Sequence, residues 1–230
     1  MALILSIDTS TAICSVAIHQ EGKLLASNEL FVDKTHSENL AAIIQHLMQY
    51  LGFCPQDFDA FAVSKGPGSY TGLRIGVSTA KGLCFANDKP LIAIGSLEAM
   101  AYQFKYFNPG AEGTICTMLD ARRMEVFCAM FDATGSTYVL PTEAHVVEEN
   151  SFEPFLSAGP VYFVGNSNEK VKAVIHHPQA NFVSHIYPSA KYIGYLAEEA
   201  FAAAKFEDLA YFEPYYLKEF MSTSKKQITV

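Results

Sequence analysis

A glycine-rich block is the first segment whose residue types could do chemistry. Residues 66–76 read GPGSYTGLRIG and lie between an apolar run and a helical pattern. Glycines let a backbone approach a ligand, and the free amides at the start of a helix attract anions such as phosphate. The block is neither a Walker A loop nor G-x-G-x-x-G, because Thr71 occupies the place of the third glycine. A tight turn capped by Ser69 or Thr71 is the alternative, and the residues favour it over phosphate binding.

A second polar loop follows the first apolar run of the chain. Asp8, Thr9 and Ser10 supply one carboxylate and two hydroxyls, which are groups that could hold a metal-bound phosphate. The same composition is also typical of a loop that only turns the chain. This segment alone therefore leaves both interpretations open.

The arginines are concentrated in two motif-like segments. All three of them, Arg74, Arg122 and Arg123, lie in the glycine block or in the run Asp120-Ala121-Arg122-Arg123. A guanidinium suits bidentate pairing with a phosphate or a carboxylate. An internal ion pair with Asp120 or Glu125 is an equally good interpretation.

No metal site or activated nucleophile is predicted. His36 and His46 are ten residues apart on one predicted helix, which separates them by about 15 Å along its axis, and no H-x-x-x-H occurs. Ser69 has no neighbouring His or Lys to act as a base. We therefore expect no catalytic residue and no metal ligand in this chain.

The elements that must position these segments alternate between strands and helices, which predicts an α/β protein of two lobes. Asn108-Pro109-Gly110 is the best break, so we expect an N-terminal lobe over 1–107 and a C-terminal lobe over 108–230. Thr35 and Glu38 form a capping box, and Ser96 and Ser189 are predicted to cap later helices. We predict strands at 2–7, 13–19, 23–31, 58–64, 90–94, 114–119, 124–131 and 161–164, and helices at 36–51, 72–86, 96–106 and 189–204.

Composition and charge exclude several classes of protein. The chain has 230 residues, with 16 Lys and Arg against 24 Asp and Glu, so its net charge of −8 argues against a broad nucleic-acid surface. Five Cys without a C-x-x-C pair argue against a disulfide framework and favour a reducing compartment. No apolar run approaches the ~20 residues of a membrane span, and the opening MALILSIDTS lacks the features of a secretory signal. We expect a cytoplasmic protein.

Five segments, in order along the chain, together resemble the bacterial TsaB family, formerly YeaZ. They are residues 5–10 (LSIDTS), 35–38 (THSE), 64–76 (SKGPGSYTGLRIG), 120–123 (DARR) and 213–218 (EPYYLK). The resemblance implies the two-lobed fold of the actin, hexokinase and heat-shock ATPase superfamily. It also implies a role in making threonylcarbamoyladenosine (t6A) in tRNA, next to the anticodon, as the partner of the catalytic subunit TsaD and together with the ATPase TsaE.

The resemblance further implies that the chemistry belongs to the partners. His36 is followed four residues later by Leu40, so the metal-binding H-x-x-x-H of the catalytic paralogue is absent. We expect a non-catalytic scaffold without a tightly bound cofactor, because ATP, Mg and the catalytic metal belong to partner subunits, and we expect it to meet tRNA only through the complex. The glycine block, with Asp8, Thr9 and Ser10, is then a vestigial phosphate loop or a rigid turn. We favour the turn, and the site residues considered for a phosphate in the block are Gly66, Gly68, Ser69, Thr71, Gly72 and Arg74.

Two predicted helices carry apolar stripes, which we expect to pair with the paralogue, or with a second copy when the paralogue is missing. These stripes are Leu40, Ile44 and Leu47 on one helix and Leu73, Val77, Ala80 and Cys84 on the other. The tail, residues 206–230, is expected to return to the N-terminal lobe, and His36, Asp120, Arg122 and Arg123 keep an open role. Two alternatives are a small-molecule kinase of the same superfamily and a protease or protease regulator.

Overall fold

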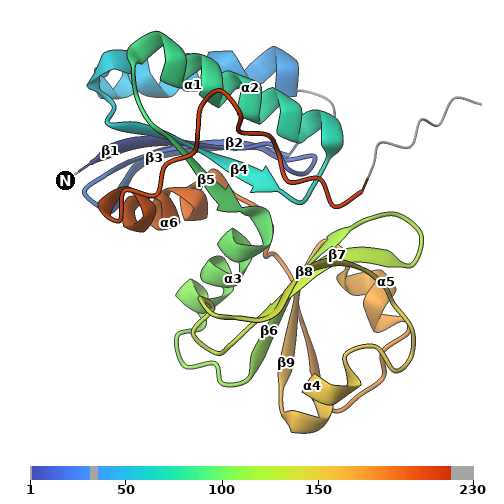
Figure 1. The fold of residues 1–230 in the computed structure, drawn as a ribbon. Coiled ribbons are helices and arrows are strands. Elements are labelled where there is room, and N and C mark those ends of the chain that lie inside the picture. Colours follow the sequence, from blue (N-terminus) through green and yellow to red (C-terminus); the bar gives the residue numbers. More distant parts are fainter. Residues whose placement is uncertain (1, 32–35, 219–230) are drawn as a thin grey trace, which may run out of the picture.

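The computed structural model describes residues 2–31 and 36–218, which form two lobes (Figure 1). Each lobe is built around a five-stranded mixed sheet. The strands of the N-terminal sheet are β1 (Leu3–Asp8), β2 (Cys14–Gln20), β3 (Lys23–Leu30), β4 (Ala60–Gly66) and β5 (Leu91–Gly95). The strands of the C-terminal sheet are β6 (Thr114–Asp120), β7 (Glu125–Phe131), β8 (Tyr138–Val146), β9 (Val161–Gly165) and β10 (Ala180–Val183).

The two sheets repeat one topology. The N-terminal sheet has the order β3-β2-β1-β4-β5 and the C-terminal sheet the order β8-β7-β6-β9-β10. In both, three strands form an antiparallel meander and two more add in parallel beside the first strand. No repeat is visible in the residues themselves, because a topology needs only the same order of apolar runs and turns.

Helices cover both faces of the N-terminal sheet. Strand β1 is buried on its two faces. Leu3, Leu5 and Ile7 pack with α1 (His36–Leu51) and α2 (Tyr70–Asn87), while Ala2 and Ile4 pack with α6 (Ala190–Ala202). Figure 1 shows α1 and α2 together on one side of this sheet and α6 on the other. The helices are α1 (His36–Leu51), η1 (Pro55–Asp57), α2 (Tyr70–Asn87), α3 (Ser96–Phe107), α4 (Glu153–Ala158), α5 (Asn168–Lys172) and α6 (Ala190–Ala202).

The chain returns to the N-terminal lobe after building the C-terminal one. Helix α6, which the division at residue 108 assigns to the second lobe, packs against β1, β2, β4 and β5. The small and aliphatic side chains on that face of the sheet need a cover, and α6 supplies it. Residues 205–216 continue along the same lobe, where Glu207 N donates to Leu91 O at 2.9 Å and Tyr215 N to Lys65 O at 2.7 Å.

Helix α3 lies between the two lobes. Leu97, Met100 and Phe104 pack into the core of the C-terminal sheet, whereas Ala99 and Tyr102 pack with α6. Because one helix contributes to both cores, the two lobes share apolar contacts as well as chain connections.

Several local predictions differ from the structure. Strand β8 has no predicted counterpart because Pro141 interrupts its pattern, and the structure explains this by placing β8 at an edge, where a missing amide is tolerated. The short elements α4, α5 and β10 are also unpredicted. The cap of α3 is Gly95 and not Ser96, whose hydroxyl instead lies 2.7 Å from that of Ser64. The proposed cap Thr35 lies outside the described residues.

Candidate functional site: the glycine loop, two helix faces and the cleft between the lobes

The glycine loop packs directly against the loop after β1. Thr9 Oγ1 donates to Gly72 O at 2.7 Å, and Ser69 N donates to Ser10 O at 2.6 Å. A methyl group on Gly72 would lie 2.1 Å from Thr9 O, and one on Gly68 would lie 2.3 Å from Ser10 O. The glycines thus allow two backbones to approach each other. In a phosphate-binding loop, glycines instead let the backbone approach the phosphate.

The start of α2 is capped from within the chain. Helix α2 begins at Tyr70, two residues earlier than predicted, and Ser69 Oγ accepts a hydrogen bond from Gly72 N at 3.2 Å. Ser69 O also accepts from Leu73 N at 2.8 Å, while the side chain of Thr71 is exposed. Ser69, one of the two predicted caps, therefore uses an amide that an anion at this helix start would need.

Asp8 is a poor ligand for a metal-bound phosphate in this arrangement. Its carboxylate is buried, and its Oδ1 accepts hydrogen bonds from Ser10 N at 3.0 Å and from Ser10 Oγ at 2.9 Å. Burial raises the pKa of Asp8, although hydrogen bonds from Ser10 and Ser64 act in the opposite direction. The two loops touch where Gly68 and Gly72 meet Ser10 and Thr9, so that contact leaves no room for a phosphate, while Oδ2 of Asp8 has no hydrogen-bond partner among the described residues.

The side chain of Arg74, the remaining residue of the block, packs against the C-terminal segment, residues 205–218. Its guanidinium is 4.2 Å from the centre of the Tyr70 ring, and its Nε donates to the Tyr216 hydroxyl at 3.2 Å. Gly66 adopts a φ of +106° at the start of the loop, where Lys65 O accepts from Tyr215 N. These contacts attach the EPYYLK segment to the glycine loop, which the sequence pattern could not reveal.

The apolar stripes of α1 and α2 face inward, which corrects the predicted partner surface. All seven residues are buried, with at most 9% of any residue exposed, and all but Leu73 pack together in one core cluster of the N-terminal lobe. An apolar stripe at helical spacing packs first against its own sheet, so it identifies the buried face of each helix. These core residues are Leu40, Ile44, Leu47, Leu73, Val77, Ala80 and Cys84.

The outward faces of the same two helices are exposed and nearly uncharged. Residues 39–51 of α1 contain no Asp, Glu, Lys or Arg, and residues 75–87 of α2 contain only Lys81. The ammonium of Lys81 donates to the carbonyl oxygens of Ala210 and Phe212 in the C-terminal segment. Two aromatic side chains stand in this surface, Tyr50 at 88% and Phe85 at 84% exposed.

A cleft of about 900 Å³ lies where the C-terminal segment meets the edge of β8. Three carboxylates and several tyrosines line it, but Lys65 is the single Lys or Arg among its lining residues. A polyphosphate would meet mostly carboxylates and aromatic rings there. The acidic lining is contributed by Glu207, Asp208 and Glu213.

The remaining motif residues have local partners. His36 Nε2 lies 2.8 Å from Thr11 O, beside the first polar loop. Asp120 accepts from Arg122 N at 2.9 Å and pairs with Lys170, and its own amide donates to Asn166 Oδ1 at 2.8 Å. Partial burial raises the pKa of Asp120, but the hydrogen bond from Lys170 lowers it, and the pKa as a whole lies below its ordinary value. The ion-pair partner of Asp120 is therefore Lys170, and not one of the arginines that the sequence suggested.

Neither a metal cluster nor a membrane helix occurs in the described residues 2–31 and 36–218. Within these ranges no three His, Cys, Asp or Glu side chains gather closely enough to hold a metal ion. None of the described helices is long and apolar enough to cross a membrane.

His19 on β2 is a buried titratable residue that sequence patterns did not single out. Both ring nitrogens lack a hydrogen-bond partner among the described residues, and the ring packs edge-on against Tyr195 at 4.8 Å. Desolvation by burial lowers the pKa of His19 to about 4. The alternation of β2 between buried faces could have identified it, because His19 falls on the face covered by α6.

This burial predicts a pH-dependent stability. The folded pKa lies below the ordinary value, so the unfolded chain binds a proton first and stability falls as pH decreases from about 6.5 to about 4. We expect a loss of ~3 kcal/mol in the free energy of unfolding from this residue. Urea unfolding across this range should show the loss in the wild type and a smaller one in His19→Leu. Parallel pH curves for the two proteins would contradict the assignment.

Comparison with known proteins identifies relatives of this chain. The family model described as "TsaD: tRNA N6-adenosine threonylcarbamoyltransferase" matches residues 30–227. The "tRNA threonylcarbamoyladenosine biosynthesis protein TsaB" of Bacillus subtilis (strain 168) is 37% identical over 174 residues, which are 75% of this chain and 74% of that protein.

Solved structures support the same relationship. YeaZ from Pseudomonas aeruginosa superposes with a TM-score of 0.83 at 28% identity, covering 94% of this chain and 100% of that one. An activator of 2-hydroxyisocaproyl-CoA dehydratase from Clostridium difficile, with bound ADPNP, has a TM-score of 0.52 at 12% identity, covers 88% and 97% of the two chains, and shows the fold alone. The two-lobed fold is shared with that activator, and the chain belongs to the TsaB (YeaZ) family.

Proposed function

We propose that this chain is a non-catalytic subunit in the biosynthesis of t6A in tRNA, and that it binds a catalytic paralogue of the TsaD type through the outward faces of α1 and α2. Its relatives named TsaB support the pathway. The observation that carries the mode of action is the exposed surface on these two helices, where residues 39–51 and 75–87 together contain Lys81 as their single Asp, Glu, Lys or Arg. The solvent face of a helix normally carries charged residues, so a face without them is typical of a protein interface.

The composition of that surface suits a packed interface between helices. Ala42 on α1 and Ser78 and Gly82 on α2 are small and exposed, so another helix can approach closely. Tyr50 and Phe85 project as aromatic anchors, the residue types that dominate binding energy in interfaces. When the paralogue is missing, a second copy of this chain would cover the same surface.

The glycine loop serves as a rigid turn in this proposal. Its contacts with Thr9 and Ser10 fix the start of α2 and so the direction of the helix that docks. We expect no tightly bound nucleotide in this chain, and ATP, Mg and the ATPase TsaE act through the partner subunits. The contact between the backbones of the two loops supports this turn over the kinase alternative, because it leaves the glycines no room for a phosphate at that point.

The proposal places the protein in the cytoplasm, with tRNA met through the complex. Its five cysteines are free thiols, four of them buried, which suits a reducing compartment. The location and the contact with tRNA both follow from the role in t6A biosynthesis, and the same experiment tests them.

The test is the t6A content of tRNA in cells of the source organism after depletion of this chain. Mass spectrometry of digested tRNA should show t6A falling as the protein disappears and returning with the wild-type gene. A variant charged on the outward face, Phe85→Glu, should fail to restore it although the protein accumulates. Unchanged t6A after depletion would contradict the proposal.

A further inference from the structure

A strained, basic loop joins β6 to β7 and takes no part in the helix surface described above. Arg122 and Arg123 both have positive φ angles, 71° and 50°, and both side chains are exposed. Two consecutive non-glycine residues in the left-handed region are uncommon, and they persist only where the surroundings hold them. The loop therefore has a fixed shape, and Arg122 and Arg123 project from it.

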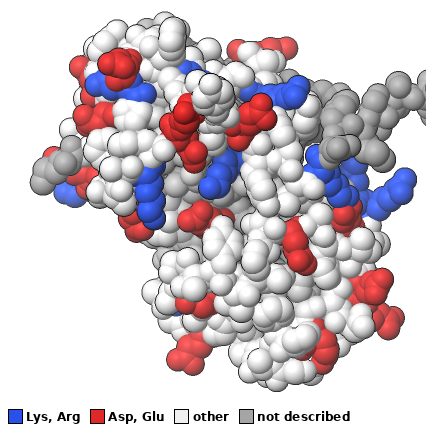
Figure 2. Space-filling model, in the orientation of Figure 1, with Lys and Arg blue, Asp and Glu red and all other residues white. Residues whose placement is uncertain are grey.

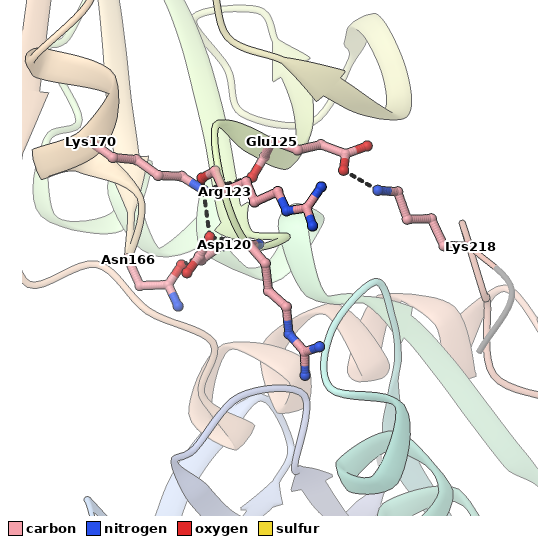
Figure 3. A network of polar contacts seen from close by, with 7 residues as sticks. Asp120, Arg123, Glu125, Asn166, Lys170 and Lys218 are labelled. Atoms are coloured by element: carbon pink, nitrogen blue, oxygen red, sulfur yellow. Dashed lines mark hydrogen bonds and ion pairs between the residues drawn. The ribbon is translucent and has the colours of Figure 1, made fainter. Parts of the chain in front are cut away.

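Lys170 on α5 is the residue that holds this loop. Its ammonium pairs with Asp120 and donates to the carbonyl oxygens of Arg123 at 3.0 Å and Glu125 at 2.6 Å. Backbone hydrogen bonds close the turn on either side, from Ala121 N to Glu125 O and from Glu125 N to Arg122 O. Figure 3 shows Lys170 and Asn166 on one side of the loop and Arg123 extending on the other, toward Glu125 and Lys218.

The carboxylates beside the loop already have lysine partners. Asp120 pairs with Lys170 and Glu125 pairs with Lys218. Among the described residues, neither arginine forms an ion pair, although the charge of Asp120 is close to Arg122. Four cationic side chains thus meet two carboxylates, which leaves a local excess of positive charge in a chain whose net charge is −8. Figure 2 shows Lys and Arg gathered beside the junction of the two lobes.

We propose that Arg122 and Arg123 bind phosphate groups of the tRNA backbone when the complex presents its substrate. Exposed guanidiniums on a loop whose backbone has a fixed shape can pair with phosphate oxygens, and such contacts position RNA without reading its sequence. The proposal rests on the proposed function, which brings a phosphate-rich macromolecule to this chain. An acidic protein is the other polyanion that could fit, and the test below separates the two.

The test compares tRNA binding by the complete complex with its wild-type chain and with Arg122→Gln/Arg123→Gln. Glutamine keeps the backbone strain and much of the side-chain length but removes two charges. Fluorescence anisotropy with an unmodified tRNA transcript, repeated over a range of salt, should give about tenfold weaker binding near physiological salt. The slope of log K against log salt should become shallower by about two, roughly one for each phosphate that the variant no longer binds.

Two further variants act as controls. Lys23→Gln/Lys205→Gln removes the same charge from exposed positions at the far end of the N-terminal sheet, and its salt slope should equal that of the wild type. Arg122→Lys/Arg123→Lys keeps the charge and should retain most of the slope while its affinity falls in part. If the two arginines had only a structural role in the loop, their lysine and glutamine variants would change the salt slope alike.

The outcomes distinguish this inference from the proposed function. Light scattering first checks that each variant joins the paralogue, and failure of the wild type to join overturns both ideas. A complex that forms but binds tRNA with the same affinity and slope in the glutamine variant overturns only the phosphate-binding role. Labelled poly-glutamate that binds the wild type but not the glutamine variant, with tRNA binding unchanged, would assign the loop to an acidic protein instead.

Discussion

Replacing Gly72 with alanine is expected to lower the free energy of unfolding by at least ~3 kcal/mol, and Gly68→Ala should act in the same direction. The added methyl group would lie 2.1 Å from the carbonyl oxygen of Thr9 at Gly72, or 2.3 Å from that of Ser10 at Gly68. Backbone atoms cannot move aside as a flexible side chain can, so the two loops must separate. Urea unfolding followed by circular dichroism measures the loss directly.

Gly82, which lies in the same helix as Gly72, provides the matched control. Nothing lies within 4 Å of a methyl group on Gly82, which is exposed on α2. Gly82→Ala should therefore be neutral or stabilise the protein by up to ~1 kcal/mol, through helix propensity alone. If Gly72→Ala were as stable as Gly82→Ala, the two loops would not be in contact, and a phosphate between them would again be possible.

A negative charge on the outward face of α1 or α2 is expected to abolish pairing with the catalytic paralogue without unfolding the protein. Ala42→Glu and Phe85→Glu change exposed positions, so the melting temperature should shift by only a few degrees. An unpaired charge buried in an interface costs ~2–5 kcal/mol, which weakens binding by roughly 30-fold to several thousandfold. Isothermal calorimetry with the purified paralogue gives the affinity.

The choice of positions separates docking from folding. Ala80→Asp, on the inward face of α2, would place a charge in the core and should unfold the protein. Ala202→Glu adds the same charge to an exposed position of α6 and should leave both stability and pairing unchanged. Normal pairing by both Ala42→Glu and Phe85→Glu would exclude these helix faces as the interface.

The amino-acid sequence predicts most elements, but it cannot tell which face of a helix a partner uses. The stripe Leu73, Val77, Ala80 and Cys84 predicts the helix correctly because apolar spacing follows the helical period. The assignment of the same stripe to a partner is wrong, because a helix must first cover its own sheet. The proposed partner surface carries no periodic signal, since it is marked only by a scarcity of charged residues.

Long-range pairing accounts for the other differences. The glycine block and the polar loop after β1 each have the composition of a phosphate loop, and only the fold brings them into contact with each other. Asp120 has arginines as its neighbours in the sequence, but Lys170, fifty residues later, is its partner. Pro141 interrupts the strand pattern of β8, so that edge strand is not predicted. The two sheets share one topology, but no repeat is visible in the amino-acid sequence.

In the proposed function, this chain supports t6A formation without supplying its chemistry. The most direct measurement is t6A formation on an unmodified tRNA transcript, with the purified paralogue, the ATPase, threonylcarbamoyl adenylate and ATP, while the amount of this chain is varied. We predict that product appears only with this chain present, saturates at a stoichiometric ratio to the paralogue, and is absent when this chain is the sole protein. Full product formation without this chain would contradict the account.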